Sequence, residues 1–165
     1  EDREMAGEVI KSFASPGTTP AGLAFDGKYL WLSDSSADLI YQIDLNGKVI
    51  KSFASPGGTP QGLAFDGKYL WHCDYTADLI YQIDLNGKVI KSFAIPGAIP
   101  AGLAFDGKYL WHCDSSADKI YQINLNGKVI KSFASPGAIP QGLAFDGKYL
   151  WHCDSSADLI YQIRR

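Results

Sequence analysis

The chain has 165 residues and a formal net charge of −3, from 15 Lys and Arg against 18 Asp and Glu. This weak acidity argues against nucleic acid as a partner, because binding to phosphates requires clustered positive charge. With 46% apolar and 13% aromatic residues, the composition is that of a globular protein with a substantial core. No apolar run approaches the roughly 18 residues that span a bilayer, so we expect no membrane segment.

The chain begins with an irregular head, residues 1–6, which lacks the basic-then-apolar order of a signal peptide. The remainder, residues 7–165, is interpreted as one domain of four repeats, at 7–46, 47–86, 87–126 and 127–165. The second and third repeats are identical at thirty-two of forty positions, which suggests recent amplification, reconstruction or engineering. A period of this length is typical of solenoids and propellers.

Four short β-rich runs occupy the second repeat, at Val49–Ala54, Gly62–Phe65, Tyr69–Cys73 and Leu79–Ile83. Each run is bounded by Gly, Pro, Asn or Asp, and no segment has a useful length of helical periodicity. Asp-Gly and Asn-Gly dipeptides between the runs favour tight hairpins, because these residues accept positive φ. Each repeat is therefore predicted to be a four-stranded antiparallel meander, the size of a propeller blade.

The polarity of the runs predicts their order within a blade. The Gly-Leu-Ala-Phe run is small and uncharged, which suits an inner strand crowded around an axis, whereas Val-Ile-Lys-Ser-Phe suits an outer edge. The middle strands are apolar on both faces, as expected of a sheet between two neighbouring sheets. The four Trp residues are expected to pack between blades: Trp31, Trp71, Trp111 and Trp151.

The two ends of the repeat region predict how the ring closes. The chain starts with an outer strand, Gly7 to Ala14, and stops after Ile163 without an outer strand for the last blade. We expect Glu8–Phe13 to pair with Leu159–Ile163, which would close the ring by strand exchange and remove two exposed sheet edges.

The exchange can occur between two chains or within one. Two chains give an eight-bladed homodimer, whose blades stand about 45° apart, close to ordinary face-to-face sheet packing. One chain gives a four-bladed monomer with a very tight axis. This alternative remains possible because bulky Trp and Tyr side chains on the middle strands widen each blade away from the axis. We favour the homodimer.

The motif Pro-x-Gly-Leu-Ala-Phe-Asp-Gly-Lys-Tyr-Leu-Trp, followed by Ala-Asp-x-Ile-Tyr-Gln-Ile, resembles the repeat of NHL-like and YVTN-like β-propellers, of the streptogramin lyase and gluconolactonase kind. The resemblance covers all four repeats and implies an all-β propeller fold. The resemblance says little about function, because proteins with this fold include enzymes, scaffolds and binding proteins. Enzymes of this group place unlike polar or metal-binding residues around one end of the axis, whereas these repeats are nearly copies. We therefore expect no catalytic residues, no enzymatic activity and no cofactor.

The sequence Trp-His-Cys-Asp occurs in three repeats and contains two types of metal ligand. Adjacent strand residues point to opposite faces, so one His-Cys pair cannot reach a single ion. Leu32 and Ser33 stand at these positions in the first repeat, which favours structural packing. The metal candidates are accordingly weak: His72, His112, His152, Cys73, Cys113 and Cys153. The cysteines are read as free thiols, which suggest a cytoplasmic location without establishing one.

Most differences between repeats fall in two loops predicted to share one face of the ring. Loop variation on a rigid scaffold can create a binding face, although drift in tolerant loops produces the same pattern. The first contacts to test for a peptide or carbohydrate are Tyr75, Gln61 and Gln141. The Asp114–Asp118 loop lacks the ligand count and glycine of a calcium loop, so its carboxylates are expected to cap their own turn.

Overall fold

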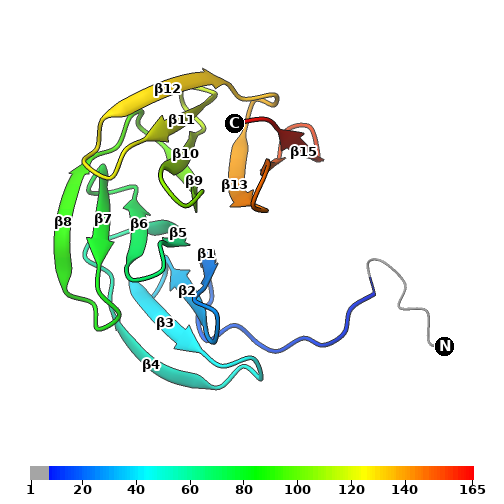
Figure 1. Ribbon diagram of the computed structural model, residues 1–165. Helices are drawn as coiled ribbons and strands as arrows, with labels where there is room; N and C mark the ends of the chain where they lie inside the picture. The colour runs from blue at the N-terminus through cyan, green and yellow to red at the C-terminus, as the bar shows by residue number, and fades with distance from the viewer. Residues whose placement is uncertain (1–7) are drawn as a thin grey trace.

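The computed structural model describes residues 8–165, which form fifteen β-strands in four sheets around a common axis (Figure 1). We call the sheets blades 1 to 4. Blade 1 contains β1 (Pro20–Phe25), β2 (Leu30–Asp34), β3 (Leu39–Ile43) and β4 (Val49–Ala54). Blade 2 contains β5 (Pro60–Phe65), β6 (Leu70–Asp74), β7 (Leu79–Ile83) and β8 (Val89–Ala94). Blade 3 contains β9 (Pro100–Phe105), β10 (Leu110–Asp114), β11 (Lys119–Ile123) and β12 (Val129–Ala134). Blade 4 contains β13 (Pro140–Phe145), β14 (Leu150–Asp154) and β15 (Leu159–Ile163).

Each blade is an antiparallel meander in chain order, with β1, β5, β9 and β13 nearest the axis (Figure 1). The inner Gly-Leu-Ala-Phe strand and the outer Val-Ile-Lys-Ser-Phe strand lie where their polarity predicted. The predicted strand ends differ from the observed ones by no more than two residues. The expected all-β propeller fold, with four blades in this chain, is therefore confirmed.

A carboxylate at each inner hairpin holds both the turn and the central tryptophan. In blade 2, Asp66 Oδ1 accepts hydrogen bonds from the backbone N–H of Lys68 and Tyr69, at 2.9 and 2.7 Å. The other oxygen, Oδ2, accepts a bond from Trp71 Nε1 at 2.7 Å. Gly67 follows with φ of +99°, a conformation that glycine adopts without strain. The Asp-Gly pair thus shapes the hairpin and satisfies the one polar atom of a buried indole.

Every blade presents two different apolar faces to its neighbours. One face, here called the Trp face, carries Trp31 and Ile40 in blade 1; the other, the Leu face, carries Leu63, Leu70 and Ile83 in blade 2. These two faces pack together, and the same pairing recurs between blades 2 and 3 and between blades 3 and 4. The three inter-blade layers contain most of the buried core.

The circle of blades is left open between blade 4 and blade 1, and the segment before β1 runs away from β15 (Figure 1). Residues 8–19 contain no strand, and blade 4 has three strands. The predicted pairing of Glu8–Phe13 with Leu159–Ile163 is therefore not formed within the chain. Its physical reason is that the segment stays with blade 1, on the far side of the opening from β15. The predicted head, residues 1–6, lies outside the described residues.

One substitution made at two turns tests the role of the inner carboxylate. Asp66→Asn removes the acceptor for Trp71 Nε1, because an amide nitrogen cannot accept that bond. We expect a loss of about 1–3 kcal/mol in the free energy of unfolding, as for a buried donor left unpaired. Asp84→Asn should change stability by less than about 0.5 kcal/mol, because Asn124 makes the same turn bonds in blade 3. Urea denaturation of both variants measures the difference, and equal effects would contradict this role.

Candidate functional site

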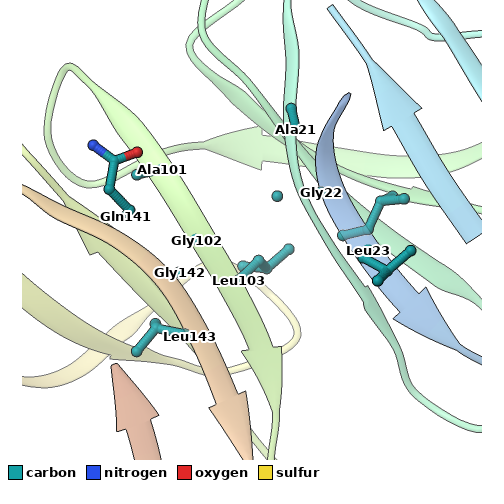
Figure 2. Close-up of a pocket in the computed structure, with 11 residues that line it drawn as sticks. Ala21, Gly22, Leu23, Ala101, Gly102, Leu103, Gln141, Gly142 and Leu143 are labelled. Carbon is teal, nitrogen blue, oxygen red and sulfur yellow. The ribbon is translucent and has the colours of Figure 1, made fainter. Parts of the chain in front are cut away.

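The inner strands surround an axial channel with a chemically layered wall. Each inner strand contains a Gly-Leu pair. Figure 2 shows the residue before this pair (Ala21, Ala101 or Gln141) at one end of the channel, the glycines in the middle and the leucines beyond them. This middle section is a cavity of about 180 Å³. The opposite mouth, about 210 Å³, is lined by Leu, Ala and Phe from all four blades. The side chains that line the channel thus change from Thr, Ser and Gln at one mouth to Leu, Ala and Phe at the other.

The polar mouth of the channel brings two of the predicted contact residues together. Gln61 and Gln141 line one cavity of about 440 Å³ with Thr19, Ser35 and Ala101, and no charged side chain contributes to its lining. Tyr75 is about half exposed and is not part of this cavity. The structure therefore groups the two glutamines and places the tyrosine apart from them.

The two variable loops do meet on one face, as predicted, and a buried aspartate joins them. Asp74 Oδ2 accepts a hydrogen bond from the backbone N–H of Thr59 at 2.9 Å, and Oδ1 accepts one from Ala77 at 2.8 Å. The backbone N–H of Tyr75 also donates to the Thr59 carbonyl at 3.0 Å. Equivalent carboxylates, including Asp114, cap their own turns in the other blades. Both carboxylate oxygens of Asp114, in the loop considered for calcium, thus accept hydrogen bonds from backbone N–H groups.

The histidines belong to the second strands of blades 2, 3 and 4, and their side chains are buried. His72 is fully buried, stacks on Tyr81 with ring centroids 5.8 Å apart, and shares a hydrogen bond with Ser55 Oγ at 3.2 Å from Nε2. Burial lowers its pKa to about 4, against the opposing charge of Asp74. His112 is equally buried, with a pKa also lowered to about 4 by burial.

His112 differs from His72 in its hydrogen bonding. Ile95 occupies the place of Ser55 in blade 3, and neither ring nitrogen of His112 has a partner among the described residues. His152 keeps the serine contact, to Ser135 Oγ at 3.3 Å. The sequence difference between Ser55 and Ile95 thus removes one buried hydrogen bond.

The cysteines point into the layers between blades. Cys73 and Cys113 are fully buried, and burial raises the pKa of each thiol to about 12, so neither is a reactive thiolate. Cys113 Sγ donates to the Gln141 carbonyl of the next blade at 3.5 Å, as Ser33 Oγ does to Gln61 at 2.7 Å. Within residues 8–165, no group of three His, Cys, Asp or Glu side chains is arranged to hold a metal ion.

The two ends of the arc are copies of the internal blade faces that are uncovered only in part, since Ile43 on the Leu face of blade 1 stays buried and Phe13 lines a cavity on that face with Leu23. On the Trp face of blade 4, Trp151 is 37% exposed and Ile160 74% exposed, whereas their counterparts in blades 1 to 3 are fully buried. On the Leu face of blade 1, Leu23 is 62% exposed, against 3% for Leu63 and Leu103. The two uncovered faces are thus complementary in type.

The glycines of the inner strands also show that blade 4 has no following blade packed against it. A Cβ atom added to Gly22, Gly62 or Gly102 would lie within 3.0 Å of the inner strand of the next blade. The same atom added to Gly142 would meet only Cys153 Sγ of its own blade, at 3.1 Å. The inner strand of blade 4 therefore has no neighbouring inner strand on this side among the described residues.

The segment before β1 already holds the place of an outer strand. Lys11 Nζ contacts Asn46 Oδ1 at 3.5 Å, as Lys51 contacts Asn86 at 3.0 Å in the following repeat. The ring of Phe13 lies over Gly47 as those of Phe53 and Phe93 lie over the equivalent glycines, Gly87 and Gly127. Relative to blade 1, residues 11–13 therefore occupy the position that an outer strand of a preceding blade would have.

No protein-family model matches this sequence, and no curated protein matches it. The solved structures give clear matches of fold. A glutaminyl cyclase from Myxococcus xanthus superposes with a TM-score of 0.77 at 15% identity, over 88% of this chain and 65% of that one. A streptogramin B lyase gives 0.68 at 20% identity, over 93% of this chain and 54% of that one.

A third structure is a virginiamycin B lyase from Staphylococcus aureus with quinupristin, at a TM-score of 0.65 and 21% identity. It matches 88% of this chain and 55% of its own. The chain therefore spans between half and two thirds of the length of these structures. At such identities the likeness concerns the fold alone. The chain is a β-propeller, and at the level of fold the resemblance to NHL-like and YVTN-like repeats is confirmed.

None of the described residues forms a helix long and apolar enough to cross a membrane.

Replacing two equivalent histidines by leucine, the residue of blade 1, separates a bonded imidazole from an unbonded one. His112→Leu removes two buried nitrogens without partners, whereas His72→Leu removes one such nitrogen, Nδ1, and the hydrogen bond between Nε2 and Ser55. We expect His112→Leu to be the more stable variant by about 1 kcal/mol, the usual net contribution of one hydrogen bond. Thermal or urea unfolding measures this difference, and a lower stability of His112→Leu would show that its imidazole has an unseen partner.

The buried histidines also predict a loss of stability in mild acid. The unfolded state protonates histidine near pH 6.5, whereas folded His72 and His112 have pKa values of about 4. The unfolded state therefore binds more protons between these values, and stability falls as the pH drops from 6.5 towards 4. We expect the unfolding midpoint of the double variant His72→Leu, His112→Leu to vary less over this range than that of the parent chain. Parallel slopes would contradict this assignment.

Proposed function

We propose that the chain is a non-enzymatic propeller scaffold, and that two copies join into an eight-bladed ring. The observation that carries the proposal is the pair of uncovered end faces. Blade 4 offers a Trp face and blade 1 a Leu face, the combination that packs at the three internal layers. In a ring of two copies, each Trp face meets the Leu face of the other copy at two equivalent junctions.

The size of the uncovered surface supports this assembly. Burying one large apolar side chain contributes roughly 1.5–3 kcal/mol, and two are exposed at each end. They are Leu23 and Phe25 on the Leu face of blade 1, and Trp151 and Ile160 on the Trp face of blade 4. The partial coverage of longer solved structures also supports it, since the four blades match only part of those chains.

Strand exchange would complete each junction. The internal register pairs Ile40 with Phe53 and Gln42 with Lys51. The same register across the junction would pair Ile160 with Phe13, and Gln162 with Lys11, of the other copy. Blade 4 would gain its fourth strand, and residues 8–14 would gain sheet hydrogen bonds while keeping their contacts with blade 1.

The absence of enzymatic activity is part of the proposal, and the chemistry of the channel supports it. A catalytic site requires groups with distinct roles and matched pKa values. The residues that line the axial cavities carry neither a charged side chain nor an imidazole. His72, His112, Cys73 and Cys113 are buried, and the one thiol in the lining of these cavities is that of Cys153, with no imidazole or carboxylate beside it in the lining.

A second candidate function is binding of a neutral ligand at the variable loop face. Its supporting observation is the cavity of about 440 Å³ that Gln61 and Gln141 share. Carboxamides and hydroxyls without charge suit the hydroxyl groups of a carbohydrate or the backbone of a peptide. Titration with oligosaccharides, and its loss in Gln141→Ala, tests this candidate; Tyr75→Ala serves as the control outside the cavity.

The mass of the native particle tests the two-copy ring. We expect twice the 18.0 kDa of one chain by native mass spectrometry or light scattering at micromolar concentration. Cys153, which is exposed in the single chain, should then react with a thiol reagent as slowly as buried Cys73 and Cys113. A one-chain particle with protected Cys153 would instead establish the four-bladed monomer.

The same substitution at two sites provides a matched control. Ile160→Lys places a charge in the junction and should weaken dimerisation by about a hundredfold or more, because a buried, unpaired charge is costly. Ile130→Lys changes an exposed outer-strand residue away from the end faces and should leave the mass unchanged. Dissociation by both variants, or by neither, would contradict the proposed junction.

A further inference from the structure

We infer that the free edge of blade 4 is a binding site for an extended peptide of the pattern Glu-x-x-Lys-x-Phe. The site consists of β15, the neighbouring Trp151 and Arg164 at the end of the strand. The inference deepens the proposed function, on which it rests in one respect: within the ring, the occupant is the segment 8–14 of the other copy. It adds that a free peptide of this chemistry, supplied from outside, binds the same edge.

The first component is an unpaired strand edge. β15 pairs with β14 on one side, whereas its counterparts β3, β7 and β11 pair on both sides. At the same location in blade 1, the backbone N–H of Ser55 donates to the Asp38 carbonyl at 2.8 Å and continues the β3–β4 ladder. An edge strand with free N–H and C=O groups accepts an added antiparallel strand.

The second component is an indole that lacks its usual aromatic partner. Trp31 lies beside Phe53 of its outer strand, with ring centroids 6.1 Å apart, and Trp71 lies beside Phe93 at 5.9 Å. Trp151 has no such partner among the described residues and is 37% exposed. A phenyl group from an added strand therefore has a defined place to pack.

The third component is a cation over the same indole. Lys51 Nζ lies 5.8 Å from the centre of the Trp31 ring, and Lys91 Nζ 5.7 Å from that of Trp71. Residues two apart on a strand share one face, so the spacing Lys-x-Phe lets both side chains reach one tryptophan. Lys11 and Phe13 of this chain have that spacing.

The fourth component is a reversal of charge that distinguishes this edge from the internal ones. In blades 1 and 2, Asp44 and Asp84 end the third strand and face Lys48 and Lys88 across a turn, with backbone hydrogen bonds of 2.9 Å. At the end of β15 the equivalent residue is Arg164, and at the start of the segment before β1 it is Glu8. Both signs are exchanged, so the charges remain complementary for this one strand pairing.

The experiment measures binding of fluorescent peptides to the full chain by anisotropy. The ligand is the peptide of residues 8–14, EVIKSFA. One control is KVIKSFA, residues 88–94, which differs only in the reversed charge, and another is EVIKSAA, which lacks the phenyl group. Using the Phe13→Ala chain weakens the segment that would compete for the edge.

We expect saturable binding of EVIKSFA, about tenfold or more weaker binding of EVIKSAA, and a several-fold loss for KVIKSFA that disappears at high salt. Trp151→Ala in the Phe13→Ala chain should abolish the preference for Phe over Ala. Equal binding of all three peptides, or no saturable binding at millimolar peptide, would overturn the inference. The three peptides are compared on one and the same Phe13→Ala chain, so the differences between them do not arise from differences in folding.

The two proposals fail in distinguishable ways. The native mass without peptide reports on the ring, whereas peptide binding to the Phe13→Ala chain reports on the edge of β15. A one-chain particle that still discriminates the three peptides would remove the ring and keep the site. A two-chain particle that discriminates none of them would keep the ring and remove the site.

Discussion

The structure depends on one repeated contact, the packing of a Trp face on a Leu face between neighbouring blades. A single blade has apolar residues on both sides and cannot bury either alone, so its stability comes from its neighbours. The fully buried tryptophans and isoleucines of blades 1 to 3 show this contact when complete. On the Trp face of blade 4, which no Leu face covers, the equivalent Trp151 and Ile160 are exposed.

Local chemistry prepares each blade for that contact. The hairpin carboxylates, such as Asp66, fix the tryptophan by its indole nitrogen, and the loop carboxylates, such as Asp74, tie two loops together. These polar groups are consumed in holding the framework. Carboxylates of this kind can serve as catalytic groups or metal ligands, but here they accept hydrogen bonds within turns and loops. The side chains that line the axial channel are uncharged.

Near-identity of the repeats gives the few differences particular weight. Ile95 in place of a serine deprives His112 of a partner, and the glutamines at 61 and 141 alternate with alanines around the channel. Glu8 and Arg164 reverse the charge pattern that Asp44 and Lys48 form in blade 1 and Asp84 and Lys88 in blade 2. The glutamines line the channel, and Glu8 and Arg164 lie in the segments on either side of the open end of the arc.

The sequence by itself determined the meander, the order of its strands and the turn chemistry, because these depend on alternation within forty residues and on Asx-Gly pairs. It also indicated that His72 and Cys73 face opposite sides of a strand. Tyr75 could not be separated from Gln61 in this way, since both lie in loops on one face and only the fold shows which loop residue lines the channel. Whether residues 8–14 join β15 of the same chain was equally beyond a repeat pattern. Tertiary structure decided it, because the packing angle between blades leaves the first and last faces apart, and that angle is set by the side chains of two blades together.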